Sequence, residues 1–230
     1  MNPAAAPNDS CFLNKRIQSE SDSRMNSPLF RTPFEHDRDR IIHSRAFRRL
    51  MHKTQIFNSR TNDHIRNRLT HTMEVYQIAR SLGKALDLNI NLIEAIALGH
   101  DIGHTPLGHE GEAMLNEISL REMGEYFAHN IQSVRHLLEV DGNGEGLNLS
   151  VQVLDGIMCH NGEILAPRYE PCSKTKEEFL AEYKSAYKDI KAFNKNRPMT
   201  LEGCVVRISD VIGYIGRDIE DAIMIGKIKR

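Results

Sequence analysis

The sequence predicts an all-α protein, and three observations lead to that prediction. Apolar residues recur at three- and four-residue steps along most of the 230-residue chain, whereas the strict alternation typical of strands is scarce. Glycine and proline gather between these periodic segments, where helices end. The chain is long enough for one sizeable core and has no internal repeat. We expect one helical domain over residues 31–230, after a polar, turn-rich and poorly ordered segment over residues 1–30.

Two predicted helices place histidines on buried faces. Over residues 64–86, one helical stripe carries His71, Val75, Ile78, Ala79, Leu82 and Leu86. Over residues 91–102, one face carries Ile93, Ile96, Ala97 and His100. The second helix stops at Gly103, and Pro106 and Gly108 forbid a regular helix through GHTPLGH. His71 and His100 are therefore expected to face the interior.

Five further helices are expected. The first runs from near Gly108 to about Ile118. The next two cover FAHNIQSVRHLLEV and LSVQVLDGIMCH. The fourth contains the apolar stripe over residues 179–190, and the fifth begins near Thr200. The connection DGNGEG lacks the Gly-Lys-Ser/Thr ending of a phosphate-binding loop. The last helix is predicted to carry Asp210, Tyr214 and Asp218 on one side, opposite the core positions Val205, Ile208 and Ile212.

Composition restricts the function classes. Lys and Arg number 30 and Asp and Glu 31, so the net charge of -1 gives no overall attraction to nucleic acid or acidic membranes. The four cysteines include no CxxC pair, which fits neither a cysteine zinc site nor a disulfide framework. A secretory signal and a long uncharged apolar run are both missing, so we expect a cytoplasmic protein with no membrane segment.

The segment HDIGHTPLGHEGE, residues 100–112, gathers three histidines, one aspartate and two glutamates. Imidazole and carboxylate groups bind Mg, Mn, Fe and Zn ions, and a His-Asp pair at a helix end can direct both side chains at one ion. Taken singly, each such residue is more often a hydrogen-bonded core residue, so the prediction depends on their combination. We predict one divalent-metal site between helices, with the ligands His71, His100, Asp101 and Asp210.

This arrangement resembles the HD-domain metal-dependent phosphohydrolases, and more closely the deoxyguanosine triphosphate triphosphohydrolases and related deoxynucleotide triphosphohydrolases. The resemblance runs from about residue 31 to the end, through RDRIIHSRAFRRLMHKTQIF, NRLTHTMEVYQIAR, HDIGHTPLGHEGE and HNIQSVRHL. It implies an HD-domain helical bundle with a single divalent metal, Mg or Mn in first place and Fe or Zn as alternatives. It also implies hydrolysis of dGTP, or of a broader set of deoxynucleoside triphosphates, to deoxynucleoside and triphosphate.

The resemblance further implies substrate contacts. Arg68, one turn before His71, is expected on a phosphate. Gln55 matches a position at the sugar or base, and His129 one near the phosphates. Tyr214 and Asp218 match positions that contact the sugar 3′-hydroxyl.

The segment 31–68 is basic, which suits a tetra-anionic triphosphate. It contains ten Lys or Arg residues against four Asp or Glu, a local net charge of +6. Within EHDRDR, however, we prefer pairing of the arginines with Glu35, Asp37 and Asp39 in one helix.

Catalytic roles are assigned next to the metal. A histidine that titrates near neutrality can protonate a poor alkoxide leaving group, and a carboxylate one turn on can fix its tautomer. We assign His109 as the acid for the leaving 5′-oxygen, Glu112 as its orienting partner, and water on the ion as the nucleophile at the α-phosphorus. The division of labour between these two stays partly open, and His104 is a candidate hydrogen-bond donor to a phosphate oxygen. His136 and His160 are interpreted as structural.

Two departures from the family pattern bear on function. Family members usually run well past 230 residues, so we expect the family's C-terminal part to be lacking here, through a fragment, a natural short form or a frameshift. That part would contribute to phosphate binding, base discrimination and the oligomer interface, and the full-length protein is expected to form a homo-oligomer. RISD stands where family members often carry a longer acidic run at the last ligand.

Two alternatives remain open. An HD phosphohydrolase acting on a nucleoside monophosphate, a cyclic nucleotide or a guanosine alarmone would share all four ligands. A weakly active regulator could bind deoxynucleotides or single-stranded nucleic acid through residues 31–68. That last interpretation has the least support, because aromatic residues are only 6% of the chain and Trp is absent, which leaves no surface for base stacking.

Overall fold

The fold is all-α, as predicted. The computed structural model describes residues 31–56, 64–161, 168–190, 195–224 and 226–228, except the side chains of residues 216–218. The predicted poorly ordered segment, residues 1–30, lies outside these ranges. Within them, strand-type pairing is limited to one isolated antiparallel bridge between Thr54 and Asn67. No helix in these ranges combines the length and apolarity needed to cross a membrane.

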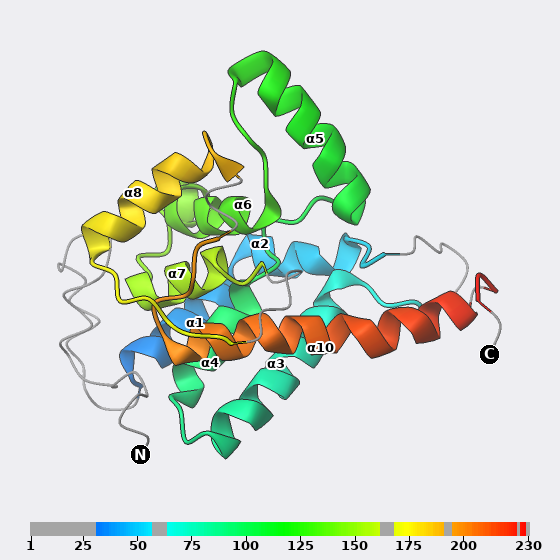
Figure 1. The fold of residues 1–230 in the computed structure, drawn as a ribbon, viewed down its shortest axis with the longest axis horizontal. Coiled ribbons are helices and arrows are strands. Elements are labelled where there is room, and N and C mark those ends of the chain that lie inside the picture. The colour runs from blue at the N-terminus through cyan, green and yellow to red at the C-terminus, as the bar shows by residue number, and fades with distance from the viewer. Residues whose placement is uncertain (1–30, 57–63, 162–167, 191–194, 225, 229–230) are drawn as a thin grey trace.

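The helices follow one another along the whole described chain (Figure 1). In order they are α1 (Pro33–His43), α2 (Arg45–Arg49), the 3-10 turn η3 (Leu50–His52), α3 (Arg68–Ala85), α4 (Ile90–Gly99), α5 (Gly108–Met123), α6 (His129–Arg135), the π-helical turn η4 (His136–Val140), the 3-10 turn η5 (Gly142–Gly144), α7 (Val151–Met158), α8 (Lys176–Ala186) and α10 (Leu201–Met224).

Helix α4 is the centre of the core. Its sequence, INLIEAIALG, is apolar on nearly every side, and every residue from Leu92 to Gly99 is buried. It packs against α1, α3, α7 and α10. The backbone of Gly99 lies against Ile157 and Ile41, so a larger side chain there would collide with α7. The His-Asp pair that follows α4 is therefore carried by a helix that is buried over most of its length.

Helix α5 stands away from this body (Figure 1). It begins at Gly108, as predicted, but extends past Ile118 to Met123, where Gly124 adopts the left-handed conformation (φ 65°) that ends a helix. Only Gly108 and Ser119 are buried in it. Its N-terminal part, which contains His109 and Glu112, is joined to α6 through the contacts of Glu112 with His129.

Some predicted positions are corrected by the structure. The helix expected from residue 64 begins at Arg68, because Asn67 caps it by accepting a hydrogen bond from the Thr70 amide. Leu86, predicted on the apolar stripe, is exposed because the helix has already ended at Ala85. Ile212, predicted in the core, is 47% exposed, because the inward face of α10 is formed there by Val211 and Gly213.

The acidic residues of EHDRDR have three different environments. Asp39 pairs with Arg38 and Arg31, as expected for a surface helix. Asp37 is instead fully buried and accepts a hydrogen bond from the Ser150 amide, 2.9 Å away. Glu35 completes a capping box with Thr32. The acidic residues of this segment therefore serve mainly to start α1 and to fix the start of α7.

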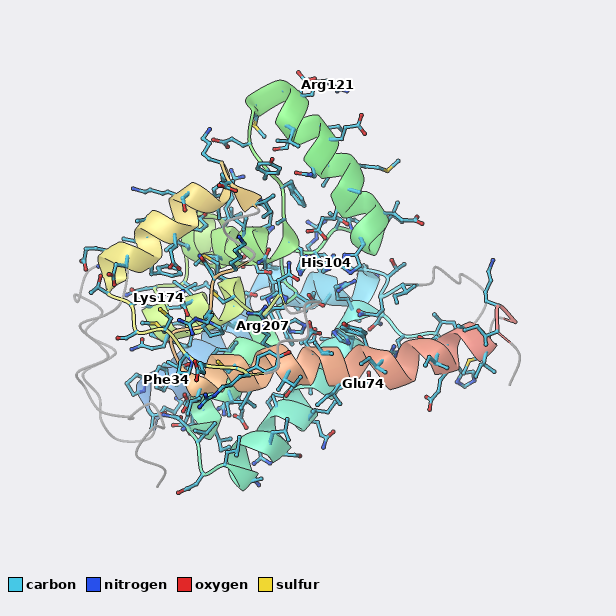
Figure 2. The ribbon with its side chains drawn as sticks, in the orientation of Figure 1. Phe34, Glu74, His104, Arg121, Lys174 and Arg207 are labelled. Atoms are coloured by element: carbon cyan, nitrogen blue, oxygen red, sulfur yellow. The ribbon has the colours of Figure 1, made fainter. Side chains whose placement is uncertain are left out.

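A buried ion pair joins α7 to the chain before α8. Lys174, labelled in Figure 2, donates to Asp155 Oδ1 at 2.8 Å and to Glu182 at 2.7 Å. The second oxygen of Asp155 accepts the Met199 amide at 2.6 Å. Asp155 is fully buried and Lys174 is 6% exposed. The pair connects α7, α8 and the segment that leads into α10.

Replacing Lys174 by methionine should destabilise the fold by about 3 to 5 kcal/mol, because the Asp155 carboxylate would remain buried without its counter-ion. Chemical denaturation of both proteins measures the difference. Lys188→Met is the matched control, since Lys188 pairs with Glu125 on the surface, and it should change stability by less than about 1 kcal/mol. Equal losses in the two variants would contradict the assignment.

Candidate metal centre

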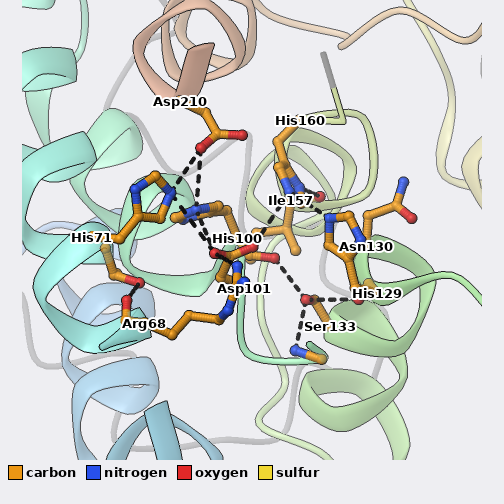
Figure 3. A network of polar contacts seen from close by, with 12 residues as sticks. Arg68, His71, His100, Asp101, His129, Asn130, Ser133, Ile157, His160 and Asp210 are labelled. Atoms are coloured by element: carbon orange, nitrogen blue, oxygen red, sulfur yellow. Dashed lines mark hydrogen bonds and ion pairs between the residues drawn. The ribbon is translucent and has the colours of Figure 1, made fainter. Parts of the chain in front are cut away.

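Four side chains from three helical segments lie close together, and these are the four predicted metal ligands (Figure 3). His71 Nε2 lies 2.9 Å from Asp210 Oδ1 and 3.8 Å from Asp101 Oδ2. His100 Nε2 lies 3.3 Å from Asp101 Oδ2 and 3.8 Å from Asp210 Oδ1. Ligands at about 2.0–2.2 Å from one ion are separated by about 3.0–3.4 Å. The separations of 2.9 and 3.3 Å lie close to that range, whereas the two separations of 3.8 Å are longer.

The local structure explains why these side chains meet. His71 lies on the inner face of α3, and Asp210 lies on α10, the helix with the most extensive packing against α3. His100 is the C-cap of α4 and Asp101 follows it, so both extend beyond the last turn of that helix. The pair therefore reaches the space between α3 and α10 from the end of α4.

The tautomer of His100 leaves an electron pair for a cation. Its Nδ1 lies 2.7 Å from the Ala97 carbonyl oxygen, which can only accept, so Nδ1 carries a proton. Its Nε2 is buried without a hydrogen-bond partner. A buried imidazole nitrogen that faces two carboxylates is a good ligand position. The residues present therefore fit a divalent metal ion.

Electrostatics support the same conclusion. Burial lowers the pKa of His100, but Asp101 and Asp210 outweigh it and raise that pKa to about 9. Burial raises the pKa of Asp101, yet His100 and Arg68 hold it well below its usual value. The pKa of Asp210 is also lowered, so the carboxylates stay ionised and demand positive charge, which a metal ion held by these residues would supply.

A second cluster adjoins the first and contains the predicted catalytic residues. Glu112 accepts the backbone amide of His129 at 2.7 Å and lies 3.0 Å from its Nδ1. His109 Nδ1 lies 3.3 Å from the other Glu112 oxygen, which forms the i, i+3 pair expected from the sequence. His104 stacks on His129, with ring centroids 4.1 Å apart. One carboxylate therefore orients two histidines.

The members of this cluster differ in burial and protonation. Burial raises the pKa of Glu112, but hydrogen bonds from His109 and His129 outweigh it and hold the carboxyl ionised. Burial, followed by repulsion from His129, lowers the pKa of His104 well below its usual value. The His109 side chain is 61% exposed, so a bound substrate can reach it from solvent. Figure 2 places His104 at the base of α5.

His160, interpreted as structural from the sequence, lies inside this arrangement. Its Nε2 is 3.3 Å from His129 Nε2 and 3.9 Å from Asp101 Oδ1. It follows the end of α7 as His100 follows α4, and its Nδ1 lies 2.6 Å from the carbonyl of Ile157, three residues earlier. The only sequence signal was this position at a helix end. His136, also interpreted as structural, is half-buried and belongs to neither cluster.

The predicted substrate-contact residues have varied positions. Arg68 is 2% exposed and donates to Asp101 Oδ2 at 2.6 Å and to the Gln55 carbonyl at 3.0 Å. Gln55 is buried beside Gly108, and its Oε1 has no hydrogen-bond partner. Tyr214 is half-buried one turn after Asp210. The side chain of Asp218 lies outside the described residues.

Hydrogen bonds join the turn that carries His100 and Asp101 to α6. Ser133 Oγ donates to the His100 carbonyl at 2.6 Å and accepts the Gly103 amide at 2.8 Å. A side chain at position 103 would collide with the backbone of Ser133 and His129. Only glycine permits this close approach. The contact fixes both clusters relative to each other.

Ser133→Ala should weaken metal affinity by about 10- to 100-fold, because the turn before Asp101 loses its anchor and the Gly103 amide loses its buried acceptor. Isothermal titration with Mn²⁺ measures the affinity. Ser44→Ala is the control: Ser44 caps α2, so its loss costs about 0.5 to 2 kcal/mol of stability without touching the site. If both variants bind Mn²⁺ equally well, the hydrogen bonds of Ser133 do not position the metal ligands.

Comparison with known proteins identifies the family of the chain. The HD domain family matches residues 68–214. A deoxyguanosinetriphosphate triphosphohydrolase-like protein of Caldanaerobacter subterraneus subsp. tengcongensis is 48% identical over 193 residues, 84% of this chain and 46% of that protein. Proteins of the same name from Clostridium tetani (48% identity, 87% of this chain, 49% of that protein) and Desulfatibacillum aliphaticivorans (41%, 95% and 55%) are also similar. The chain spans about half the length of these curated relatives.

The family match includes the whole interval from His71 to Asp210. It therefore contains all four candidate ligands, with α3, α4 and the part of α10 up to residue 214. On this evidence the chain belongs to the HD-domain family.

Proposed function

We propose that this protein is a metal-dependent hydrolase that converts deoxynucleoside triphosphates, dGTP among them, to deoxynucleoside and triphosphate. The observation that carries the proposal is the convergence of His71, His100, Asp101 and Asp210 beside the His109–Glu112 pair. The names of the curated relatives support the substrate class. A divalent ion bound there would polarise a phosphoryl oxygen and acidify a water molecule; we propose Mn²⁺ or Mg²⁺.

The residues of this chain would divide the work as follows. His109 donates a proton to the 5′-oxygen as the bond from that oxygen to the α-phosphorus breaks. Glu112 keeps the imidazole oriented through the 3.3 Å contact with Nδ1, which leaves Nε2 directed away from the carboxylate. Arg68, held by Asp101 and by the backbone of residues 54 and 55, adds fixed positive charge beside the phosphates.

Further residues are proposed to bind the rest of the substrate. Gln55 Oε1, buried beside the start of α5, would accept a hydrogen bond from the sugar or base. Tyr214 and Asp218 would contact the 3′-hydroxyl from α10. His104 and His129 would lie near the phosphates. The alternative substrate, another nucleotide, would use the same four ligands and differ in its products.

Product analysis tests the substrate assignment. Incubation of the purified chain with each deoxynucleoside triphosphate and Mn²⁺ should release deoxynucleoside and inorganic triphosphate, separable by anion-exchange chromatography. The matched ribonucleotides are the control. Release of monophosphate, orthophosphate or pyrophosphate would favour the alternative nucleotide substrates instead.

Replacing His109 should separate catalysis from metal binding. His109→Ala is expected to lower the single-turnover rate by about 10²- to 10⁴-fold and to leave metal content unchanged, because His109 is not one of the four proposed ligands. Asp101→Ala should lose the metal. Glu110→Ala, an exposed neighbour on the same turn, is the control and should retain both properties. Loss of metal in His109→Ala would move the acid role to Glu112 or His104.

A further inference from the structure

The segment Lys53–Gln55 contacts two separate parts of the chain that supply candidate ligands. On one side, the Lys53 carbonyl accepts the amide of Arg68, the first residue of α3, at 3.0 Å. On the other side, the Lys53 ammonium group donates to the Ile102 carbonyl oxygen at 2.7 Å. Ile102 directly follows Asp101 in the turn after α4. Lys53 therefore joins the start of α3 to the turn that carries the His-Asp pair.

The two residues after Lys53 make contacts of the same kind. The amide and the hydroxyl group of Thr54 both lie 3.0 Å from the Pro106 carbonyl oxygen, farther along the same turn. The Arg68 guanidinium donates to the carbonyl of Thr54 at 3.3 Å and to that of Gln55 at 3.0 Å. These hydrogen bonds fix the backbone from which the Lys53 side chain extends, so its ammonium group has a defined position.

The surroundings of Lys53 are costly for a charged side chain. Burial lowers its pKa to about 8; Asp101 opposes this effect, and Arg68 and Arg49 add to it. Ionisable groups in such surroundings are typical of functional sites. A charged donor also makes a shorter and stronger hydrogen bond to a carbonyl than a neutral donor does. The turn is thus anchored by a strong contact at the peptide next to Asp101.

We propose that Lys53 is a positioning residue for the candidate metal centre: its ammonium group holds the turn that presents Asp101 in a fixed place relative to α3. Ser133 holds the His100 carbonyl and the Gly103 amide from α6, whereas Lys53 holds the carbonyl between them from the side of α3. This inference rests on the proposed function, because it takes the four candidate ligands to bind a divalent ion.

Titration of the chelator-stripped full chain with Mn²⁺ in a calorimeter tests this role. Lys53→Met keeps the apolar part of the side chain but removes the donor, and it should weaken Mn²⁺ affinity by about 10- to 100-fold. Lys53→Arg keeps a charged donor and should recover most of that loss. Lys84→Met, at an exposed position of α3, removes the same charge and should bind Mn²⁺ as wild type does.

The electron paramagnetic resonance line shape of bound Mn²⁺ should also change in Lys53→Met, because it depends on the ligand geometry. A lower melting temperature of Lys53→Met with unchanged Mn²⁺ affinity and line shape would overturn the proposal, since a merely structural lysine gives that result. Equal losses of affinity in Lys53→Met and Lys84→Met would overturn it as well. Circular dichroism checks the fold, and Lys53→Gln replaces Lys53→Met if the latter does not fold.

The two proposals fail in different ways. Wild type that binds Mn²⁺ but releases no triphosphate contradicts the proposed substrate and leaves the role of Lys53 standing. Triphosphate release by wild type, together with unchanged Mn²⁺ affinity in Lys53→Met, contradicts the role of Lys53 alone.

Discussion

The buried carboxylate of Asp101 and the partly buried carboxylate of Asp210 impose the main constraint on this structure. Ionised groups in the interior need positive charge close by, and Arg68 supplies one fixed charge through its 2.6 Å contact with Asp101. A proton on His100, or a metal ion in its place, supplies the next. Helices α3, α4 and α10 pack against one another so that these groups meet.

Two imidazoles reach the candidate metal centre because each follows the end of a helix. His100 and His160 follow the last turns of α4 and α7, and each donates its Nδ1 proton to the carbonyl three residues before it. This hydrogen bond gives a partner to a carbonyl at the helix end that has none within the helix. It also fixes the tautomer of the histidine. Both Nε2 atoms then point beyond the helix, toward Asp101. The same local geometry thus serves helix termination and ligand orientation.

Close backbone contact fixes the two clusters relative to each other. Gly103 meets the backbone of α6 where any side chain would collide, and Ser133 bridges the two segments with one hydroxyl. α6 carries His129, and His129 holds Glu112 of α5 through both its amide and its ring. The otherwise exposed α5 is therefore tied to the centre by its first turn.

The sequence by itself predicted the helical class, the inward faces that carry His71 and His100 and the helix-end position of Asp101, because helical periodicity and helix-end positions are local properties. It also predicted the His109–Glu112 pair, since residues three apart share a helix face. Tertiary structure alone decided the exposure of Ile212, the pairing of Arg68 with Asp101 and the place of His160 beside His129. The two contacts join residues 33 and 31 positions apart in the sequence, and the exposure of Ile212 depends on where α10 meets its neighbours. No local sequence pattern encodes such long-range packing.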